Sequence, residues 1–548
     1  MIRITDLALP LDHAPEALPQ AVCAALGIAP ARLAGWSIAR RGHDARRRGA
    51  IKLVYAIDAV VADAAELLAR HAGNPAIRPT PDTTWRPPVV APAGYAGERP
   101  VVIGAGPCGL LAALTLAQMG LKPIILERGQ AVRERTRDTW GLWRRKLLKP
   151  ESNVQFGEGG AGTFSDGKLY SRIKDPRHLG RKVLVEFVKA GAPPEILTEA
   201  HPHIGTFRLV TMVMSIRETI EALGGEYRFG TRVEGFHVET APERQLAGLA
   251  LSTGESLAAR HVILAVGHSA RDTFAALHAA GVAIEAKPFA IGLRIEHPQG
   301  WIDRARFGAA AGHKALGPAA YALSHRAGNG RGVYSFCMCP GGRVVAATSE
   351  AGRVVTNGMS QYSRAEFNAN SGLVVDITPS RDFPGGPLAG IALQRHWEEQ
   401  AFLAGGGDYR APGQRVGDFL AGRASSGFGS VTPSYQPGVN PTDLSACLPD
   451  FAIAAIREAL PVFGRRIAGY DHADAVLTGV ETRTSSPVRI PRGRDRQSVN
   501  TTGLYPGGEG AGYAGGILSA AVDGIVLAEA VAARLLAPAG DRAGAGAR

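Results

Sequence analysis

Cysteine is scarce in this chain. Only five cysteines occur among 548 residues, and no two of them have the C-x-x-C spacing of a redox dithiol or a zinc knuckle. A sparse, odd-numbered set in a chain of this length indicates a reducing compartment. We therefore expect free thiols and no structural zinc site.

Long hydrophobic runs are also missing. No uncharged apolar stretch reaches the ~18 residues that a membrane-spanning helix needs. The segment 1–13 lacks the basic stretch and apolar run of a signal peptide. These absences predict a cytoplasmic protein with no membrane span. Neither an HExxH nor a GxxxxGK[ST] motif nor a Ser-His-Asp order is visible, so we expect no metal and a cofactor that carries the chemistry.

Glycine, in contrast, is abundant, with 69 residues and no three-residue period. The hydrophobic fraction of 45% and the charged fraction of 20% are ordinary for a globular protein, which excludes disorder and a collagen-like repeat. The formal net charge of +12 favours an anionic ligand. It is too dilute to imply nucleic acid by itself.

The first 78 residues predict a small domain of their own. Apolar patterning indicates strands over 3–9, 35–39 and 51–61 and helices over 15–26 and 63–71. This βαββα order favours a small α+β, ferredoxin-like domain. The proline-rich stretch 79–97 reads as a linker.

An arginine-rich loop separates the second and third strands of that domain and contains Arg40, Arg41, Arg46, Arg47 and Arg48. It could contact RNA, or it could be the solvated tip of a hairpin. Aromatic side chains that would stack on bases are almost absent nearby, which favours the hairpin tip and makes nucleic acid an unlikely partner.

A glycine pattern at 104–109 predicts a dinucleotide site. It follows an apolar strand at 101–103 and opens a helix, and the next strand ends at Glu127. Gly104 permits the tight turn, Gly106 lets a pyrophosphate approach the backbone, and Gly109 lets the helix pack on the strand. The helix N-terminus favours the negative charge, and Glu127 can accept hydrogen bonds from ribose hydroxyls.

The same G-x-G-x-x-G string occurs twice more, at 157–162 and 510–515. The first of these follows no apolar strand, and the second has no returning strand after it. We therefore expect no separate NAD(P)-binding domain.

Three segments resemble the motifs of flavoproteins with two dinucleotide-binding domains. Residues 101–129 look like the FAD-binding start, 261–267 like the second signature strand, and 503–524 like the closing motif. More narrowly, residues 151–169, 336–342 and 481–490 are similar to a family of largely uncharacterised bacterial FAD-dependent dehydrogenases. The resemblance spans about 98–535.

This resemblance implies an α/β fold class. A Rossmann-type FAD-binding domain would hold an inserted mixed α+β substrate domain and follow the N-terminal ferredoxin-like domain. The expected division is 1–78 for the N-terminal domain, 79–97 for the linker, 98–285 and 474–540 for the two parts of the FAD-binding domain, and 286–473 for the substrate domain.

The resemblance and the glycine geometry together predict the residues that contact FAD. They are Gly104, Gly106, Pro107, Cys108, Gly109, Glu127, Arg128, Arg135, Gly160, Ala161, Gly162, Lys168, Val233, Ala265, Gly267, Gly508, Glu509, Gly510, Gly515, Gly516 and Ile517. Glu509 would bind the ribityl chain, and the helix that begins near Gly515 would direct its positive end towards the flavin. Arg128 and Arg135 could offset the pyrophosphate charge, or they could be ordinary surface arginines.

Catalytic candidates are fewer. Lys168 could lie near the flavin ring and raise its reduction potential, or it could be a surface lysine after a turn. Arg294 and Glu296 share one face of a predicted strand with His297 at its end, which suggests a polar pocket with a proton donor or a structural ion pair. Arg483 is a candidate for binding an anionic substrate.

Cys337 and Cys339 lie on one face of another predicted strand. Same-face Cα atoms in a strand are about 6.5–7 Å apart, the upper edge of disulfide reach. Buried, unreactive thiols are the expectation here.

The predicted function is an FAD-dependent oxidoreductase that transfers a hydride between an unidentified small organic substrate and FAD, with NAD(P)H or another electron carrier completing the cycle. The motifs do not distinguish a dehydrogenase from a monooxygenase. The alternatives are a flavoprotein that acts on RNA through its basic N-terminal domain, and a non-catalytic FAD-binding scaffold.

Overall fold

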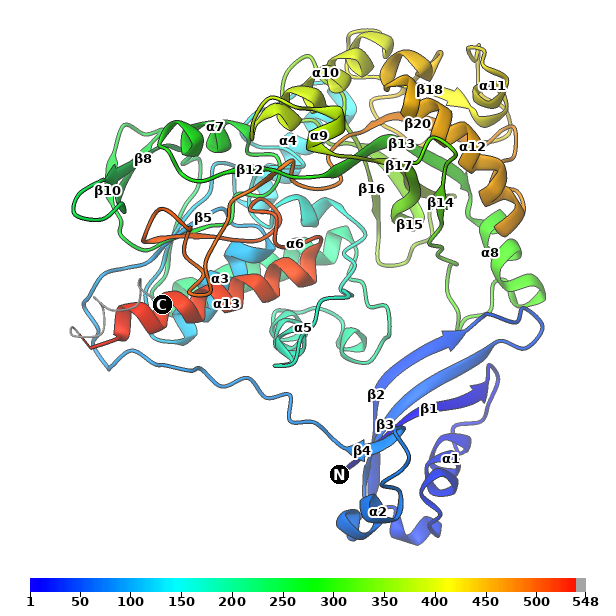
Figure 1. The fold of residues 1–548 in the computed structure, drawn as a ribbon. Helices are drawn as coiled ribbons and strands as arrows, with labels where there is room; N and C mark the ends of the chain where they lie inside the picture. The colour runs from blue at the N-terminus through cyan, green and yellow to red at the C-terminus, as the bar shows by residue number, and fades with distance from the viewer. Residues whose placement is uncertain (539–548) are drawn as a thin grey trace.

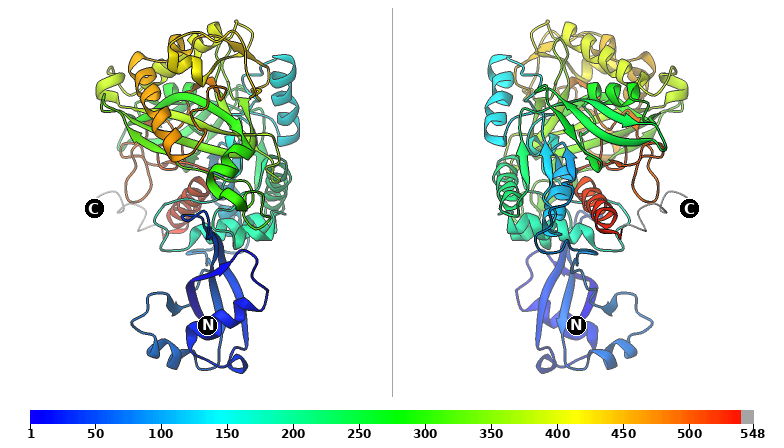
Figure 2. Two further views of the ribbon diagram at one scale, coloured as in Figure 1. Left: turned by 90° about the vertical axis from the view of Figure 1, so that its right-hand side faces the viewer. Right: turned by 90° about the vertical axis from the view of Figure 1, so that its left-hand side faces the viewer.

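The N-terminal unit is a four-stranded antiparallel sheet with two helices, and it projects from the rest of the molecule (Figures 1 and 2). The computed structural model describes residues 1–538. The unit contains β1 (Ile2–Pro10), α1 (Ala17–Leu26), β2 (Gly35–Asp44), β3 (Lys52–Val60), α2 (Ala64–Arg70) and β4 (Ile77–Pro79). The sheet order β2-β3-β1-β4 gives the ferredoxin-like arrangement. The short β4, which pairs with β1, was not expected from the sequence.

The β2–β3 hairpin is longer than predicted and reaches the main body. Its backbone is joined to the segment after a short helical turn: Arg41 N–H donates to the Thr198 carbonyl at 2.6 Å, and Ala200 N–H donates to the Arg41 carbonyl at 2.7 Å. The Arg41 guanidinium also lies 3.8 Å from Glu199. The hairpin therefore docks on the main body, and part of the arginine-rich loop contacts protein.

Residues 80–100 run without regular structure from the N-terminal unit to the first strand of the main body. The segment is anchored along its length. The indole of Trp85 donates to Glu529 at 3.0 Å and stacks under the ammonium of Lys182 at 3.8 Å, and Ala91 N–H donates to the Met119 carbonyl at 2.8 Å. The linker thus lies fixed against the body.

A five-stranded parallel sheet forms the centre of the FAD-binding unit. Its strands are β22 (Leu504–Pro506), β11 (Val262–Leu264), β5 (Val101–Ile103), β6 (Ile124–Leu126) and β7 (Glu226–Arg228), in that order. Helices α3 (Pro107–Gln118), α13 (Ile517–Leu536), α5 (Leu179–Lys189) and α6 (Thr206–Ala222) share a buried apolar cluster beside it. This parallel sheet with helices packed beside it confirms the predicted α/β fold class.

Helices α3 and α13 pack closely, and glycine makes this contact possible. A Cβ on Gly524 would lie 2.1 Å from the Cys108 carbonyl oxygen. Smaller elements complete this unit: α4 (Val132–Arg145), β8 (Val233–Glu239), β9 (Gln245–Leu251), β10 (Ser256–Ala258), α7 (Arg271–Ala279), β12 (Glu285–Ala286) and β21 (Val488–Arg489). The C-terminal segments thereby return to cover the cofactor fingerprint.

An eight-stranded sheet forms the unit that the sequence predicts to be the substrate domain, in the order β14-β15-β17-β13-β20-β18-β19 with β16 added to β15. The strands are β13 (Phe289–Pro298), β14 (Ser324–Arg326), β15 (Gly332–Ala346), β16 (Thr356–Ser360), β17 (Asn368–Ile377), β18 (Ala411–Arg415), β19 (Val439–Pro441) and β20 (Val476–Glu481). The helices are α8 (Gln299–Phe307), α9 (Pro379–Asp382), α10 (Ala389–Ala404), α11 (Val416–Ala421) and α12 (Asp450–Arg466). Every residue of β13 is buried, because strands and helices enclose it on all sides.

Strand β20 pairs with β13 and β18 inside this sheet. The division expected from the sequence assigns these residues to the second part of the FAD-binding domain, 474–540, of which residues 539 and 540 lie outside the described part of the chain. We propose that the chain returns to the FAD-binding unit after β20. In residues 1–538 no helix combines the length and apolarity that a membrane crossing demands.

Candidate functional site

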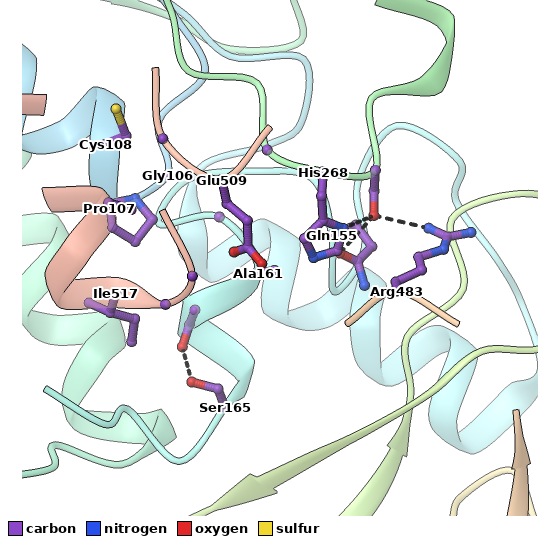
Figure 3. A pocket seen from close by; sticks show the side chains of 18 of the residues that line it. Gly106, Pro107, Cys108, Gln155, Ala161, Ser165, His268, Arg483, Glu509 and Ile517 are labelled. Atoms are coloured by element: carbon purple, nitrogen blue, oxygen red, sulfur yellow. Dashed lines mark hydrogen bonds between the residues drawn. The ribbon is translucent and has the colours of Figure 1, made fainter. Parts of the chain in front are cut away.

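A cavity of about 470 Å³ lies where the carboxyl ends of β5, β6 and β11 meet the eight-stranded sheet (Figure 3). Ligands of doubly wound proteins bind at this edge of the parallel sheet. Both large units supply its walls, with β15 and the end of β20 on the substrate-domain side. One continuous space therefore joins the glycine fingerprint to the substrate domain.

Most of the predicted FAD contacts line this cavity. They are Gly104, Gly106, Pro107, Cys108, Glu127, Arg128, Gly160, Ala161, Gly162, Lys168, Val233, Ala265, Gly267, Gly508, Glu509, Gly515, Gly516 and Ile517. They come from six separate stretches of the chain, and the fold brings them together. Gly109, Arg135 and Gly510 are not among the lining residues and lie behind the wall.

The glycines of the fingerprint leave no room for side chains. Gly104 has φ of +97°, and a Cβ there would lie 2.5 Å from the Ala265 carbonyl oxygen. A Cβ on Gly109 would lie 1.8 Å from the Gly104 carbonyl oxygen, so Gly109 serves the contact between helix and strand. A Cβ on Gly160 would lie 2.8 Å from Gly106 Cα. The result is a bare backbone cradle at the N-terminus of α3, which fits a pyrophosphate.

Glu127 is held at the tip of β6 by backbone donors. Its Oε2 accepts from Ala105 N–H, and its Oε1 accepts from Gly129 N–H and Gly157 N–H, each at 2.9 Å. Three backbone bonds fix the carboxylate at the cavity wall and leave acceptor capacity on Oε2. That orientation fits an adenosine ribose beside the pyrophosphate cradle.

The two predicted arginines have different positions. Arg128 lines the cavity, pairs with Glu151 and Asp272 at 2.8 Å each, and stacks over the Phe156 ring at 4.0 Å. Arg135 is fully buried and donates only to backbone carbonyls, those of Asn153, Val154, Gly157 and Glu158. Arg135 therefore orders the 153–158 loop.

The far end of the cradle is formed by the segment before α13. Gly516 precedes the helix with φ of +121°, and Gly162 of the facing loop would place a Cβ 3.0 Å from Ile517 Cγ1. Gly510 lies behind this wall, where a Cβ would meet the Gly267 carbonyl oxygen at 2.5 Å. Burial raises the pKa of Glu509 to about 7, although the positive charge of Lys287 acts to lower it. A helix N-terminus and a carboxyl group thus face the same part of the cavity.

Lys168 lies where the cradle meets the substrate domain. Its ammonium donates to the Met338 carbonyl and lies 3.9 Å from Asp166 Oδ2. Burial alone would lower the pKa of Lys168, but Cys337, Cys339 and Asp166 outweigh it and raise the pKa. The lysine is therefore a half-buried, charged group in the cavity wall, and it is not a freely exposed residue after a turn.

The other two catalytic candidates lie outside the cavity wall. Arg294 is fully buried and pairs with Glu481 at 3.0 Å and with Asn370 at 2.8 Å. His297 is fully buried, its Nε2 lies 2.7 Å from the Tyr470 carbonyl oxygen, and burial lowers its pKa to about 4. Neither side chain lines the cavity, because β13 is a central strand whose polar side chains pack against other elements.

Arg483 does line the cavity, but its hydrogen-bonding capacity is used within the protein. It donates to both oxygens of Glu398, at 3.1 and 2.9 Å, and to Ser349 and Ser269. Glu398 also holds Arg271 at 2.6 Å. This buried network stiffens the wall.

Several wall residues escaped the sequence analysis, among them Gln155, Ser165, Tyr170, His268, Tyr321, Asn357 and Glu481. Figure 3 shows His268, Gln155 and Glu509 around the cavity. Burial and the charges of Arg483 and Arg271 lower the pKa of His268 to about 3, so its ring is neutral at physiological pH. Burial raises the pKa of Glu481 to about 7, although the positive charge of Arg294 acts to lower it. Glu481 lies within a motif that carries the family resemblance, whereas nothing in the sequence marks Tyr321.

Comparison with known proteins agrees with this geometry. Residues 98–289 match the family described as pyridine nucleotide-disulphide oxidoreductase, and residues 288–484 match that described as FAD-dependent protein, C-terminal domain-like. Residues 1–60 match a domain of unknown function. The second of these matches includes all of β20.

A relative is found in Clostridium beijerinckii (strain ATCC 51743 / NCIMB 8052), where an uncharacterized protein is 45% identical over 531 residues, covering 96% of this chain and 98% of its own. Among solved structures, glycine oxidase from Geobacillus kaustophilus shows 11% identity and a TM-score of 0.33, covering 79% of this chain and 93% of that one. L-proline dehydrogenase from P. horikoshii shows 13% identity and a TM-score of 0.29, covering 80% and 92%. Similarity at these identities and TM-scores gives no information about the substrate of this protein.

The residues of the cavity fit FAD in three respects: a backbone cradle for the pyrophosphate, a fixed carboxylate for the ribose, and a helix N-terminus facing the opposite end. The predicted cofactor is confirmed by the matched FAD-dependent family. The chain belongs to the same family as the uncharacterized Clostridium beijerinckii protein, and its own matches identify it as an FAD-dependent oxidoreductase.

Proposed function

We propose that this protein is a dehydrogenase that transfers a hydride between a small organic substrate and FAD. The observation that carries the proposal is the continuity of the cavity from the FAD cradle to the wall formed by β15 and β20. A substrate seated against that wall shares one enclosed space with the cofactor. FAD supplies a two-electron acceptor there, and the protein binds, orients and excludes water.

Two sets of residues have distinct roles in this proposal. The α3 N-terminus, Glu127 and the segment before α13 hold the cofactor. Tyr321, Phe336, Asn357 and Glu481 line the substrate side, a mixture of aromatic and polar groups that suits a small, partly polar molecule.

Glu481 is the proton-transfer residue in this account, in place of His297. Its carboxyl group lies in the wall with a pKa of about 7, which is suited to accepting and returning a proton at neutral pH. Arg294 holds the carboxylate in position at 3.0 Å. The NAD(P)H or other carrier that completes the cycle would then enter the same space, since no second dinucleotide fingerprint is present in the sequence.

The RNA alternative has no structural observation in its favour. Of the arginine-rich loop, Arg46 pairs with Asp44 at 2.5 Å and Arg41 is docked beside Glu199. The exposed Arg46 fits the solvated hairpin tip, whereas Arg41 contacts the main body instead.

The test begins with the purified holoprotein under anaerobic conditions. NADH, NADPH and a panel of small amines, amino acids and hydroxy acids are added singly, and bleaching of the flavin absorbance is followed. At least one of these reductants should bleach the flavin rapidly. Glu481→Gln should lower kcat with little change in KM and should remove the pH dependence of kcat near pH 7. Failure of every reductant to bleach a flavin that dithionite does reduce would point to a non-catalytic scaffold.

A further inference from the structure

Cys337 occupies a position in the cavity that its strand does not predict. It lines the cavity and is partly exposed, whereas Cys339 is fully buried. Cys337 has φ of +44°, a left-handed conformation that a non-glycine residue rarely adopts within a strand. Strain of this kind is found where a side chain is directed to a particular place. The expectation of two buried, inert thiols therefore does not describe Cys337.

The strand is irregular at this point. The pairing of β15 with β17 shifts register between Phe336 and Cys339 and again between Cys339 and Gly342. Such a bulge bends the strand and re-aims its side chains. The regular 6.5–7 Å spacing of same-face residues no longer applies, and the Cys339 thiol lies 3.4 Å from the Cys337 carbonyl oxygen. The Cys339 thiol therefore packs against the backbone of Cys337.

Positive charge gathers around these two cysteines. Arg294 Nη1 donates to the Cys337 carbonyl at 3.3 Å, and the ammonium of Lys168 donates to the carbonyl of the next residue, Met338. A hydrogen bond from Cys339, with the charges of Lys168 and Arg294, lowers the pKa of Cys337 below its usual range, although burial and Asp166 act in the opposite direction.

The partner sulfur behaves in the opposite way. The bond to Cys337, burial and the neighbouring negative charge raise the pKa of Cys339 well above its usual range. Cys337, which lines the cavity, is thus the more acidic of the two thiols, and Cys339 lies behind it. A thiolate with access to a ligand and a neighbouring thiol to resolve it are the requirements for thiol–disulfide chemistry.

We propose that Cys337 and Cys339 form a redox-active dithiol that exchanges two electrons with the bound FAD and with a small external disulfide. Cys337 is the attacking sulfur and Cys339 the resolving one. The inference rests on the proposed function in one respect: the flavin has to lie at the wall formed by β15. It extends that function by identifying the electron carrier as a thiol–disulfide couple.

The electrons and atoms balance. Joining the Cys337 thiolate and the Cys339 thiol into an S–S bond breaks one S–H bond and releases two electrons and one proton. Oxidised FAD takes up those two electrons and that proton and becomes its singly negative reduced form. One negative charge is present on each side, on Cys337 before and on the flavin after, and Lys168 lies where it can stabilise both.

The exchange with the external disulfide also balances. The Cys337 thiolate attacks one sulfur of R–S–S–R, forms a mixed disulfide and releases RS⁻. Cys339, after losing its proton to that leaving thiolate, attacks the Cys337 sulfur and releases the second RS⁻. The protein disulfide is reduced again at the expense of reduced FAD, which the reductant of the proposed function replenishes.

The first experiment follows one peptide. Trypsin cleavage after Arg331 and Arg343 yields Gly332–Arg343, which contains both cysteines. In holoprotein oxidised with 2-hydroxyethyl disulfide and then desalted, this peptide should resist alkylation and be lighter by two hydrogen atoms. After anaerobic photoreduction of the flavin it should carry two alkyl groups. Two alkylatable thiols in the oxidised protein, or an intact disulfide after the flavin is reduced, would overturn the proposal.

The second experiment measures the thiolate without involving turnover. The rate of Cys337 alkylation by iodoacetamide in the apoprotein should rise with pH around a midpoint clearly below the ~8.5 of an ordinary cysteine. Lys168→Met should raise that midpoint by about one pH unit. At pH values below the midpoint, the alkylation rate should then fall about tenfold. Cys23→Ala, in the N-terminal unit, serves as a matched control and should leave it unchanged. An ordinary midpoint for Cys337 would overturn the proposal.

The two proposals can fail separately. If no NAD(P)H or metabolite reduces the flavin while the peptide still cycles between disulfide and dithiol, the hydride-transfer function fails and the dithiol remains. If reductants bleach the flavin but the peptide never changes, the dithiol fails and the dehydrogenase remains. Retention of the bound-flavin spectrum in Cys337→Ser and Cys339→Ser shows that each variant has folded.

Discussion

Arg483, which lines the cavity, and Glu398, which lies behind it, form a two-point ion pair with Nε–Oε1 at 3.1 Å and Nη2–Oε2 at 2.9 Å. Glu398 is fully buried and also holds Arg271. The carboxylate therefore balances two buried guanidinium groups at once. Removing it would leave both without their main partner.

Glu398→Gln is accordingly expected to lower the free energy of unfolding by about 3–5 kcal/mol, the typical cost of stranding a buried charge. Thermal unfolding at pH 7 measures this. The pKa of Glu398 is held well below its usual range by Arg271 and Arg483 despite burial, so the stabilisation is present above pH ~4.3 and is lost as pH falls through the folded pKa. The exposed neighbour Glu399→Gln is the control, and equal losses from the two variants would contradict the assignment.

Glu127→Ala should weaken FAD binding by about tenfold or more. The substitution removes the acceptor that faces the ribose, and it leaves three buried backbone N–H groups without their partner, each at a cost of about 1–3 kcal/mol. Titration of the apoprotein with FAD, followed by flavin fluorescence, gives the Kd. Glu134→Ala, on the exposed face of α4, should bind FAD as the parent does.

Lys168→Met should lower the reduction potential of the bound flavin by about 30–60 mV, because a positive charge that favours the reduced cofactor is removed. Spectroelectrochemical titration measures the potential directly. Lys174→Met, an exposed lysine of the following loop, should leave it unchanged. An unaltered potential in Lys168→Met would remove this role from the lysine.

Glu509 makes the stability of the apoprotein depend on pH. Its folded pKa of about 7 lies above the ~4.3 of an unfolded glutamate, so the folded state binds more protons between these values and stability declines as pH rises through them. Lys287 favours the charged form and Cys337 opposes it. Glu509→Gln should flatten the decline in melting temperature between pH 5 and 8, although Glu481 contributes a similar slope of its own. Parallel curves for parent and variant would show that Glu509 titrates normally.

The FAD cradle was predictable because its residues are dictated locally. A turn as tight as that at Gly104 admits only glycine, and the carboxylate at the end of the next strand follows the fingerprint at a fixed interval. The same holds for the glycines before α13. A residue whose constraint comes from its immediate neighbours can be found from sequence.

The substrate side was less predictable because it is assembled from distant segments. The alternation along β13 does place Arg294 and Glu296 on one face, but the burial of the whole strand turns that face into protein interior. His297 ends in a buried contact with Tyr470 for the same reason. The left-handed backbone of Cys337 arises from a bulge against β17, and nothing in a single strand's pattern reports it.

The docked β2–β3 hairpin ties the smallest unit of the molecule to the cofactor chamber. Arg41 is paired with the segment 198–200, and four residues beyond Glu199 His203 forms a β-bridge with Lys168. Residues 198–203 therefore connect the N-terminal unit directly to the segment that carries Lys168 in the cavity wall. The position of the smallest unit and the position of this lysine thus depend on the same few residues of backbone.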